Sequence, residues 1–338
     1  MRPPRDPPVT HVRRPARPFL GAQVLTDLSA LDAAFAFLGM PFGVPYDMRG
    51  VYSEASKAPD AVRAMAWEQE FADELHHYDF DLGGPLMPSG ERPSLVDLGD
   101  LEGDPRDLAG NRARGTELVE SILRAGTMPL VVGGDDSIPP IVVGAYRELE
   151  RIHVLHIDAH IDFRDEVRGV PDGYSSPIRR IREMPWVDRI VQVGMRGPGS
   201  ARPQDVADPL AAGNLIITAE VLHDKGTDWL IEQLSMDAPW FVSIDVDGLD
   251  PSVAPGTGYP LPGGLSFRQA ATLVRTIAGS GWLAGIDVTE FYPSKDVRGL
   301  TALTVVRLLM NAIGMSARGA GNERRVLPAR SGEGERNE

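Results

Sequence analysis

The chain has 338 residues, a formal net charge of −14, 42% hydrophobic residues and no cysteine. This composition is typical of a soluble globular protein, and the charge argues against a surface for nucleic acid or anionic membrane. The absence of cysteine excludes disulfides, thiolate catalysis and Cys-based zinc sites. No apolar run approaches the roughly 20 residues that span a bilayer, and the N-terminus lacks the apolar stretch of a secretory signal. We therefore expect a cytoplasmic protein.

The two ends of the chain differ in composition from its middle. Residues 1–18 contain six prolines and five arginines, which predicts a flexible or surface-lying arm. An arm laid across a neighbouring subunit is the alternative. Residues 317–338 are rich in glycine and charge and are expected to be disordered. Residues 19–316 show no repeat or linker, so a single catalytic domain is expected there.

Apolar runs alternate with segments of helical pattern through the middle of the chain. Continuous apolar runs predict buried parallel strands, and their alternation with helices predicts a parallel sheet covered on both faces. Strands are expected at 31–40, 94–99, 128–132, 154–157, 188–194, 215–218, 240–244 and 282–287, and helices from 58 and at 115–125, 228–235, 267–278 and 300–315.

An Asp-x-His-x-Asp triplet follows the strand expected at 154–157. Alternate side chains along a strand point to the same side, so Asp158, His160 and Asp162 should lie together where this strand ends. Two carboxylates and an imidazole form a suitable ligand set for a divalent metal. Solvated charges at a strand end are the alternative for the triplet taken alone.

Two further strands also end in carboxylates. Asp135 and Asp136 follow one strand, and Asp245 and Asp247 follow another. Ligands of open parallel sheets bind beyond the carboxyl ends of the strands, so all of these side chains should converge there. Unpaired carboxylates would repel one another at such short range, which favours a bound cation.

The size of this set favours two metal ions. Seven candidate ligands exceed what one ion uses, and two ions sharing carboxylates fit better. Mostly oxygen ligands favour Mn²⁺, with Ni²⁺ as the alternative. Such a pair lowers the pKa of a bound water to about 7. No Ser-His-Asp set is evident and cysteine is absent, which argues against covalent catalysis.

Four segments resemble the signature motifs of the arginase/agmatinase (ureohydrolase) family in order and spacing. The resemblance extends over residues 30–315 and implies a three-layer α/β/α arginase-like fold with a mainly parallel central sheet. It also implies a binuclear manganese site, hydrolysis of a guanidinium C–N bond to release urea, and a homo-oligomer, commonly a trimer or hexamer. The four segments are Gly133–Ser137, Asp158–Asp162, Ser243–Pro251 and Ala254–Gly258.

The resemblance also implies which residues hold the metals. Two carboxylates, Asp158 and Asp245, would bridge the ions. The first ion would take Asp136, Asp158, Asp162 and Asp245, and the second would take His160, Asp158, Asp245 and Asp247.

Other polar residues around the motifs have different expected roles. Glu290 matches the family's acid that pairs with the substrate guanidinium, a contact that suits a carboxylate. Asp135 and Asp250 are expected to support the ligands or shape loops. His156 points the same way as His160 but lies deeper in the strand, and a hydrogen-bonded core role is expected for it.

Three positions depart from the family pattern. Asp136 stands where the first motif normally has a histidine ligand, and Tyr174 stands near a histidine that shuttles protons. A phenol with a pKa near 10 is a poor proton shuttle at neutral pH. Tyr174 is therefore a candidate at the catalytic position that would shape the substrate pocket. Tyr259 replaces a threonine and adds a ring beside the substrate.

The tyrosines suggest the class of substrate. Tyr46, Tyr52, Tyr174 and Tyr259 predict an aromatic pocket, and aromatic faces suit a cation without a polar tail. We therefore expect a small-molecule guanidino substrate, either small or N-substituted.

The alternative is that the chain is a catalytically impaired paralogue. It would then act as a structural or regulatory subunit of a hetero-oligomeric hydrolase. Replacement of the family's two histidines by Asp136 and Tyr174 is the change expected in an active site that is losing its activity. Retention of five of the six family ligands, together with Glu290, favours the active enzyme. A deacetylase-like or formimino hydrolase shares the chemistry but fits the Pro-Gly-Thr-Gly block less well.

Overall fold

The computed structural model describes residues 12–44, 46, 52–199 and 201–319. Within them, ten strands form one sheet in the order β1-β4-β3-β5-β10-β9-β6-β7-β8, and β2 lies beside β4. All pairs are parallel except β1 with β4. The strands are β1 (Val12–Arg13), β2 (Gln23–Val24), β3 (Phe35–Met40), β4 (Leu95–Leu101), β5 (Met128–Gly133), β6 (Ile152–Ile157), β7 (Val187–Met195), β8 (Leu215–Thr218), β9 (Trp240–Asp245) and β10 (Leu283–Thr289).

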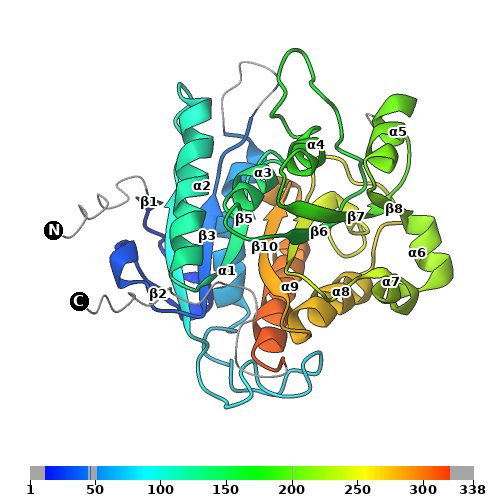
Figure 1. Cartoon of the computed structure of the whole chain (residues 1–338). Helices are drawn as coiled ribbons and strands as arrows, with labels where there is room; N and C mark the ends of the chain where they lie inside the picture. Colours follow the sequence, from blue (N-terminus) through cyan, green and yellow to red (C-terminus); the bar gives the residue numbers. More distant parts are fainter. Residues whose placement is uncertain (1–11, 45, 47–51, 200, 320–338) are drawn as a thin grey trace, which may run out of the picture.

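Helices cover both faces of the sheet, which confirms the predicted three-layer α/β/α fold (Figure 1). Apolar side chains of α2, α3 and α4 pack in one core cluster, and those of α1, α6, α7, α8 and α9 pack in the other. No described helix is both long and apolar enough to cross a bilayer. The helices are α1 (Ala58–Glu68), α2 (Leu108–Arg124), α3 (Pro139–Gly144), α4 (Pro177–Arg182), α5 (Pro203–Ala211), α6 (Ala219–Lys225), α7 (Thr227–Gln233), α8 (Phe267–Gly279) and α9 (Leu300–Ser316).

Helices α3, α4 and α5 were not predicted from the sequence, and two further helical segments differ from the prediction in their bounds. Helix α2 begins at Leu108, well before residue 115, because the Asp107 side chain caps it by accepting the Gly110 N–H over 2.9 Å. In place of one helix at 228–235, α6 and α7 meet at Gly226, whose φ of 83° suits glycine. Local capping and a left-handed glycine thus decided these boundaries.

The described ends of the chain lie against the fold. Val12 and Arg13 pair antiparallel with β4, and Arg13 Nη2 lies 2.8 Å from Asp60 Oδ2. The described part of the arm therefore lies on the surface at the edge of the sheet, one of the two expected arrangements, and an edge strand tolerates nearby prolines. Arg318 donates to the Leu86 carbonyl over 2.7 Å. The rest of the expected arm and tail, residues 1–11 and 320–338, lies outside the described residues.

Candidate metal centre and active site

Four adjacent strands bring the acidic motifs to one edge of the sheet. Strands β5, β10, β9 and β6 are neighbours in that order. Asp136 follows β5, Glu290 follows β10, Asp245 ends β9 and Asp158 follows β6. The motifs converge because the parallel strands all end on the same side.

A cavity of about 770 Å³ opens at this edge. Glu290 lines it together with Tyr174 and Tyr259, three residues that the sequence marked as substrate-binding or catalytic. Asp158 is fully buried and is not among the lining residues. Five of the six predicted ligands line the cavity: Asp136, His160, Asp162, Asp245 and Asp247.

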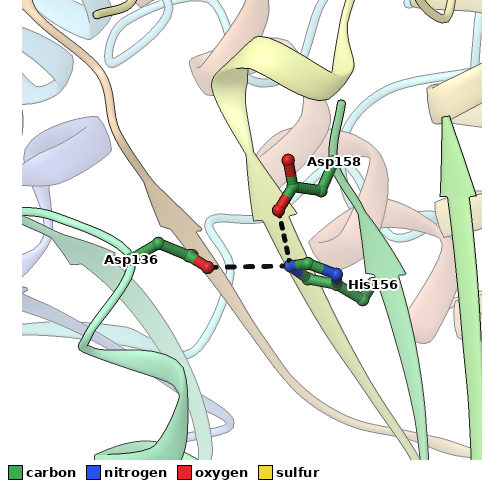
Figure 2. Close-up of side chains that lie close together, drawn as sticks. All are labelled: Asp136, His156 and Asp158. Atoms are coloured by element: carbon green, nitrogen blue, oxygen red, sulfur yellow. Dashed lines mark ion pairs between the residues drawn. The ribbon is translucent and has the colours of Figure 1, made fainter. Parts of the chain in front are cut away.

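Two groups of side chains have ligand atoms within 4.8 Å of one another. In the first, His160 Nδ1 lies 3.1 Å from Asp247 Oδ2 and 3.4 Å from Asp158 Oδ1. In the second, His156 Nε2 lies 3.2 Å from Asp158 Oδ2 and 3.7 Å from Asp136 Oδ2 (Figure 2). Asp158 belongs to both groups, and its two oxygens face different partners.

Several buried polar atoms of these groups have no hydrogen-bond partner among the residues that the structure describes. Asp136 Oδ2, Asp158 Oδ2 and both ring nitrogens of His156 are all in this state. The core position expected for His156 is confirmed by its full burial, but the hydrogen bonds expected for its ring are absent among the described residues. Unsatisfied buried polar atoms are costly, and a cation among these oxygens and nitrogens would satisfy them. The residues present thus fit a divalent metal.

The charges of the metal-free site point the same way. Burial, followed by repulsion from Asp136, raises the pKa of Asp162 to about 7. Burial also raises the pKa of Asp136, Asp158 and Asp245 well above their usual value. Carboxylates that resist ionisation beside one another are stabilised by a bound cation.

The two imidazoles differ in charge. Burial lowers the pKa of His156 to about 4, which keeps that ring neutral. Burial also disfavours the charge on His160, but the contact with Asp247 outweighs it and raises the pKa of His160 to about 9.

Local turns hold the carboxylates in place. Asp158 Oδ1 accepts the His160 N–H over 2.6 Å, and Asp245 Oδ1 accepts the Asp247 N–H over 2.8 Å. Each aspartate therefore accepts the backbone N–H two residues later, as in an Asx turn, and this contact orients its carboxylate. Asp136 Oδ1 accepts the Thr289 hydroxyl over 2.6 Å, a partner that sequence reasoning missed.

Glu290 is held in an unusual backbone conformation. Its φ is 57°, which costs about 1–3 kcal/mol for a residue other than glycine. Its Oε1 accepts the Asp136 N–H over 3.0 Å. Such strain is common at functional sites.

Asp135 and Asp250 lie in different places. Asp135 lines the cavity, and its Oδ1 accepts the Ser137 N–H over 3.0 Å. Asp250 does not line it, and its Oδ2 accepts the Gly263 N–H over 2.7 Å, which holds a loop.

The aromatic wall of the cavity is larger than expected. Tyr46 and Tyr52 line it as predicted, and Tyr292 joins them. Arg164 and Arg168 also line the cavity. Tyr292 lies two residues after Glu290, and this spacing was the available signal for it.

Comparison with known proteins identifies the family. The arginase family matches this sequence over residues 38–314. The chain belongs to the arginase family. This confirms the resemblance seen in the motifs and the predicted class of enzyme, a ureohydrolase.

Relatives of this arginase-family chain resemble it over most of their length. It is 32% identical over 308 residues to guanidinopropionase of Pseudomonas aeruginosa, covering 89% of this chain and 92% of that protein. It is 31% identical over 297 residues to mitochondrial agmatinase of Gallus gallus, covering 86% and 82%. The solved structure of proclavaminate amidino hydrolase from Streptomyces clavuligerus superposes with a TM-score of 0.75 at 26% identity, covering 92% and 99%.

Proposed function

We propose that this arginase-family chain uses two divalent metal ions to hydrolyse the C–N bond of a small or N-substituted guanidine. The products would be urea and an amine or ammonia. The observation that carries this proposal is the position of Glu290, which shares one cavity with the acidic cluster and with a wall of tyrosines. The named activities of the relatives, guanidinopropionase and agmatinase, support the same class of substrate.

The metal ions would be held by the carboxylates and His160. Asp158 and Asp245 would bridge the ions, with Asp136 and Asp162 on one side and His160 and Asp247 on the other. Mn²⁺ suits the mostly oxygen ligands, with Ni²⁺ as the alternative. When bound, such ions supply Lewis-acid activation of water near neutral pH.

Glu290 would bind the guanidinium group. A guanidinium presents N–H donors in a plane, and a carboxylate accepts two of them in parallel. Burial, followed by repulsion from Asp135 and Asp136, raises the pKa of Glu290 well above its usual value. The arriving cation would offset this repulsion and favour the carboxylate form. Glu290 is therefore matched to a positively charged ligand.

The tyrosines would surround the rest of the substrate. The rings of Tyr46 and Tyr174 lie 4.4 Å apart, and the Tyr46 hydroxyl accepts the Ser175 N–H over 2.6 Å. Burial raises the pKa of Tyr174 to about 12, so this phenol stays protonated at neutral pH. Tyr174 can then donate a hydrogen bond and orient the substrate, but it does not serve as a base.

A screen of guanidino compounds tests the proposal. The purified chain is loaded separately with Mn²⁺ and Ni²⁺, its metal content is measured, and urea release is followed for guanidine, alkylguanidines, agmatine, arginine and guanidino acids. We expect about two ions per chain and fastest release from guanidine or an alkylguanidine. Much faster release from agmatine or arginine would reject the proposed substrate.

Arg168 provides a control for substrates that carry a carboxylate. It lines the cavity, and its guanidinium could pair with the acid of a guanidino acid. Arg168→Ala should leave alkylguanidine turnover nearly unchanged. A selective loss with guanidino acids would instead assign the cavity to that class.

Three further features are proposed on composition and family resemblance. They are a cytoplasmic location, a single domain over residues 19–316, and assembly as a homo-oligomer, a trimer or hexamer. The impaired-subunit alternative predicts fewer than one ion per chain and urea release only after mixing with a paralogue. The metal measurement above therefore separates the two functions.

A further inference from the structure

Asp136, which departs from the family pattern, lies beside the imidazole of His156, a residue with no role in the proposed function. Asp136 stands in place of the expected histidine ligand, which removes one nitrogen donor from the first metal site. His156, inside strand β6, is fully buried and approaches Asp136 and Asp158 with its Nε2 atom (Figure 2).

The distances match those between ligands of one ion. Two atoms that each lie about 2.1 Å from an ion are roughly 3.0 Å apart at a right angle and about 4.2 Å apart across it. His156 Nε2 lies 3.2 Å from Asp158 Oδ2 and 3.7 Å from Asp136 Oδ2. Within the described part of the chain, all three atoms also lack hydrogen-bond partners. One ion among them would satisfy each atom.

The other buried histidine of β6 shows what a structural role looks like. His153 Nε2 lies at hydrogen-bond distance, 3.1 Å, from Asp237 Oδ1. It sits three positions before His156 and therefore faces the opposite side of the sheet. Only His156 of this pair points to the acidic cluster with both ring nitrogens unpartnered.

The sheet offers a polar neighbour beneath the ring. Ser243 of β9 is the register partner of His156, and Asp287 of β10 is the register partner of Ser243. All three side chains are fully buried, so Ser243 and Asp287 place a hydroxyl and a carboxylate in the same row as His156. Metal-binding histidines usually give their second N–H to such an oxygen. This row is thus suited to support a ligating His156.

We propose that His156 binds the first metal ion through Nε2, together with Asp136 and Asp158, and so replaces the imidazole missing at position 136. The inference rests on the proposed two-metal function. It goes beyond it because the nitrogen ligand moves from the end of β5 to the body of β6. The first site would then keep one imidazole despite the change to aspartate.

Metal content tests the exchange of ligands. His156→Val suits a strand and offers no donor, so the purified variant should bind about one ion per chain where the unchanged protein binds about two. Asp136→His in the His156→Val background restores an imidazole at the position where the family is expected to have one, and it should recover the second ion. His153→Val is the matched control and should keep both ions.

A spectroscopic readout accompanies the count. X-ray absorption of the Mn²⁺-loaded protein should report about one imidazole per metal on average, from His156 and His160, and a lower average per bound metal for any variant that keeps two ions without His156. Circular dichroism verifies folding, and His156→Gln replaces His156→Val if the latter does not fold.

The outcomes separate this inference from the proposed function. Fewer than one ion in the unchanged protein would overturn the two-metal function itself. Two ions in the unchanged protein and also in His156→Val, with the same imidazole count, would overturn only the role of His156. A loss of metal in His156→Val that Asp136→His does not reverse would also overturn it, since a packing defect would then explain the loss.

Discussion

The backbone N–H of Asp136 donates to Oε1 of Glu290 over 3.0 Å, joining the end of β5 to the end of β10. The same two segments meet again where the Thr289 hydroxyl donates to Asp136 Oδ1. One acid proposed to hold metal and one proposed to hold substrate are therefore positioned by a single pair of strand ends. Measuring metal content and urea release together shows which of the two functions a substitution in either segment affects.

Glu290→Gln should abolish most of the activity and leave the metals in place. The amide keeps the size of the side chain and can accept the Asp136 N–H, but it loses the charge that pairs with guanidinium. Loss of a charged hydrogen bond of about 1.5–3 kcal/mol lowers kcat/KM roughly 10- to 100-fold. Urea release and metal content are measured together, with the exposed Glu183→Gln as control. Undiminished turnover would rule out the role assigned to Glu290.

Thr289→Val should weaken metal binding without unfolding the protein. The variant removes the hydroxyl that orients Asp136 over 2.6 Å, and losing such a support typically costs about 10- to 100-fold in metal affinity. Competition with a chelator measures the affinity. Thr127→Val is the control. The buried Thr127 hydroxyl also donates a hydrogen bond, to the Ala33 carbonyl over 2.8 Å, but Thr127 precedes β5 whereas Asp136 follows that strand. Equal metal affinity in both variants would contradict the prediction.

The metal-free protein should lose stability as the pH rises. Burial, followed by Asp136, raises the pKa of Asp162 to about 7, so the folded chain holds a proton that the unfolded chain releases near pH 4. Burial disfavours the charge on His160, but contact with Asp247 outweighs burial and raises the pKa of His160 to about 9. The protonated ring therefore stabilises the folded protein, and this contribution is complete below pH 6.5. Both contributions fall as the pH rises through these folded values.

Melting curves from pH 5 to 9 check this expectation. With a chelator present, Tm should fall from pH 6.5 to 9, because below pH 6.5 the lowered pKa of the buried His156 acts in the opposite direction. The increase in Tm on adding Mn²⁺ should be larger at pH 8 than at pH 6, because metals replace protons on the same ligands. A Tm that rises above pH 6.5 in the chelator would contradict the assignment of these groups.

Arg63→Met should destabilise the fold at a distance from the active site. Arg63 is buried, with Nε 2.8 Å from Asp97 Oδ2 and Nη1 2.6 Å from Asp100 Oδ1. Removing one partner of a buried ion pair costs about 3–5 kcal/mol, because the remaining charges stay unpaired. Denaturation by urea measures the free energy of unfolding.

Arg151→Met is the matched control for that experiment. Arg151 and its partner Asp237 are both exposed, with Nη2 3.2 Å from Oδ2, and exposed pairs contribute about 0–1 kcal/mol. Similar losses in both variants would mean that the Arg63 cluster adds little to stability.

Local pattern was enough to identify the elements that carry the site. The strands expected at 128–132, 154–157, 240–244 and 282–287 match β5, β6, β9 and β10 to within two residues at each end. The acids after 132, 157 and 244 were recognised because strand alternation and strand ends are properties of a few consecutive residues. The motifs likewise carried the family, since they are short and contiguous. The start of α2 was missed because the Asp107 cap, and not hydrophobic periodicity, begins that helix.

The sequence by itself determined the donors of the site, namely carboxylates and imidazoles placed just after buried strands, and the enzyme family to which they belong. Only the tertiary structure decided which donors meet. The order β5-β10-β9-β6 brings Asp136 beside His156 and Glu290, although neither neighbour is near it in sequence. Strand order depends on hydrogen bonds between segments far apart in the chain, and no local pattern of residues encodes them.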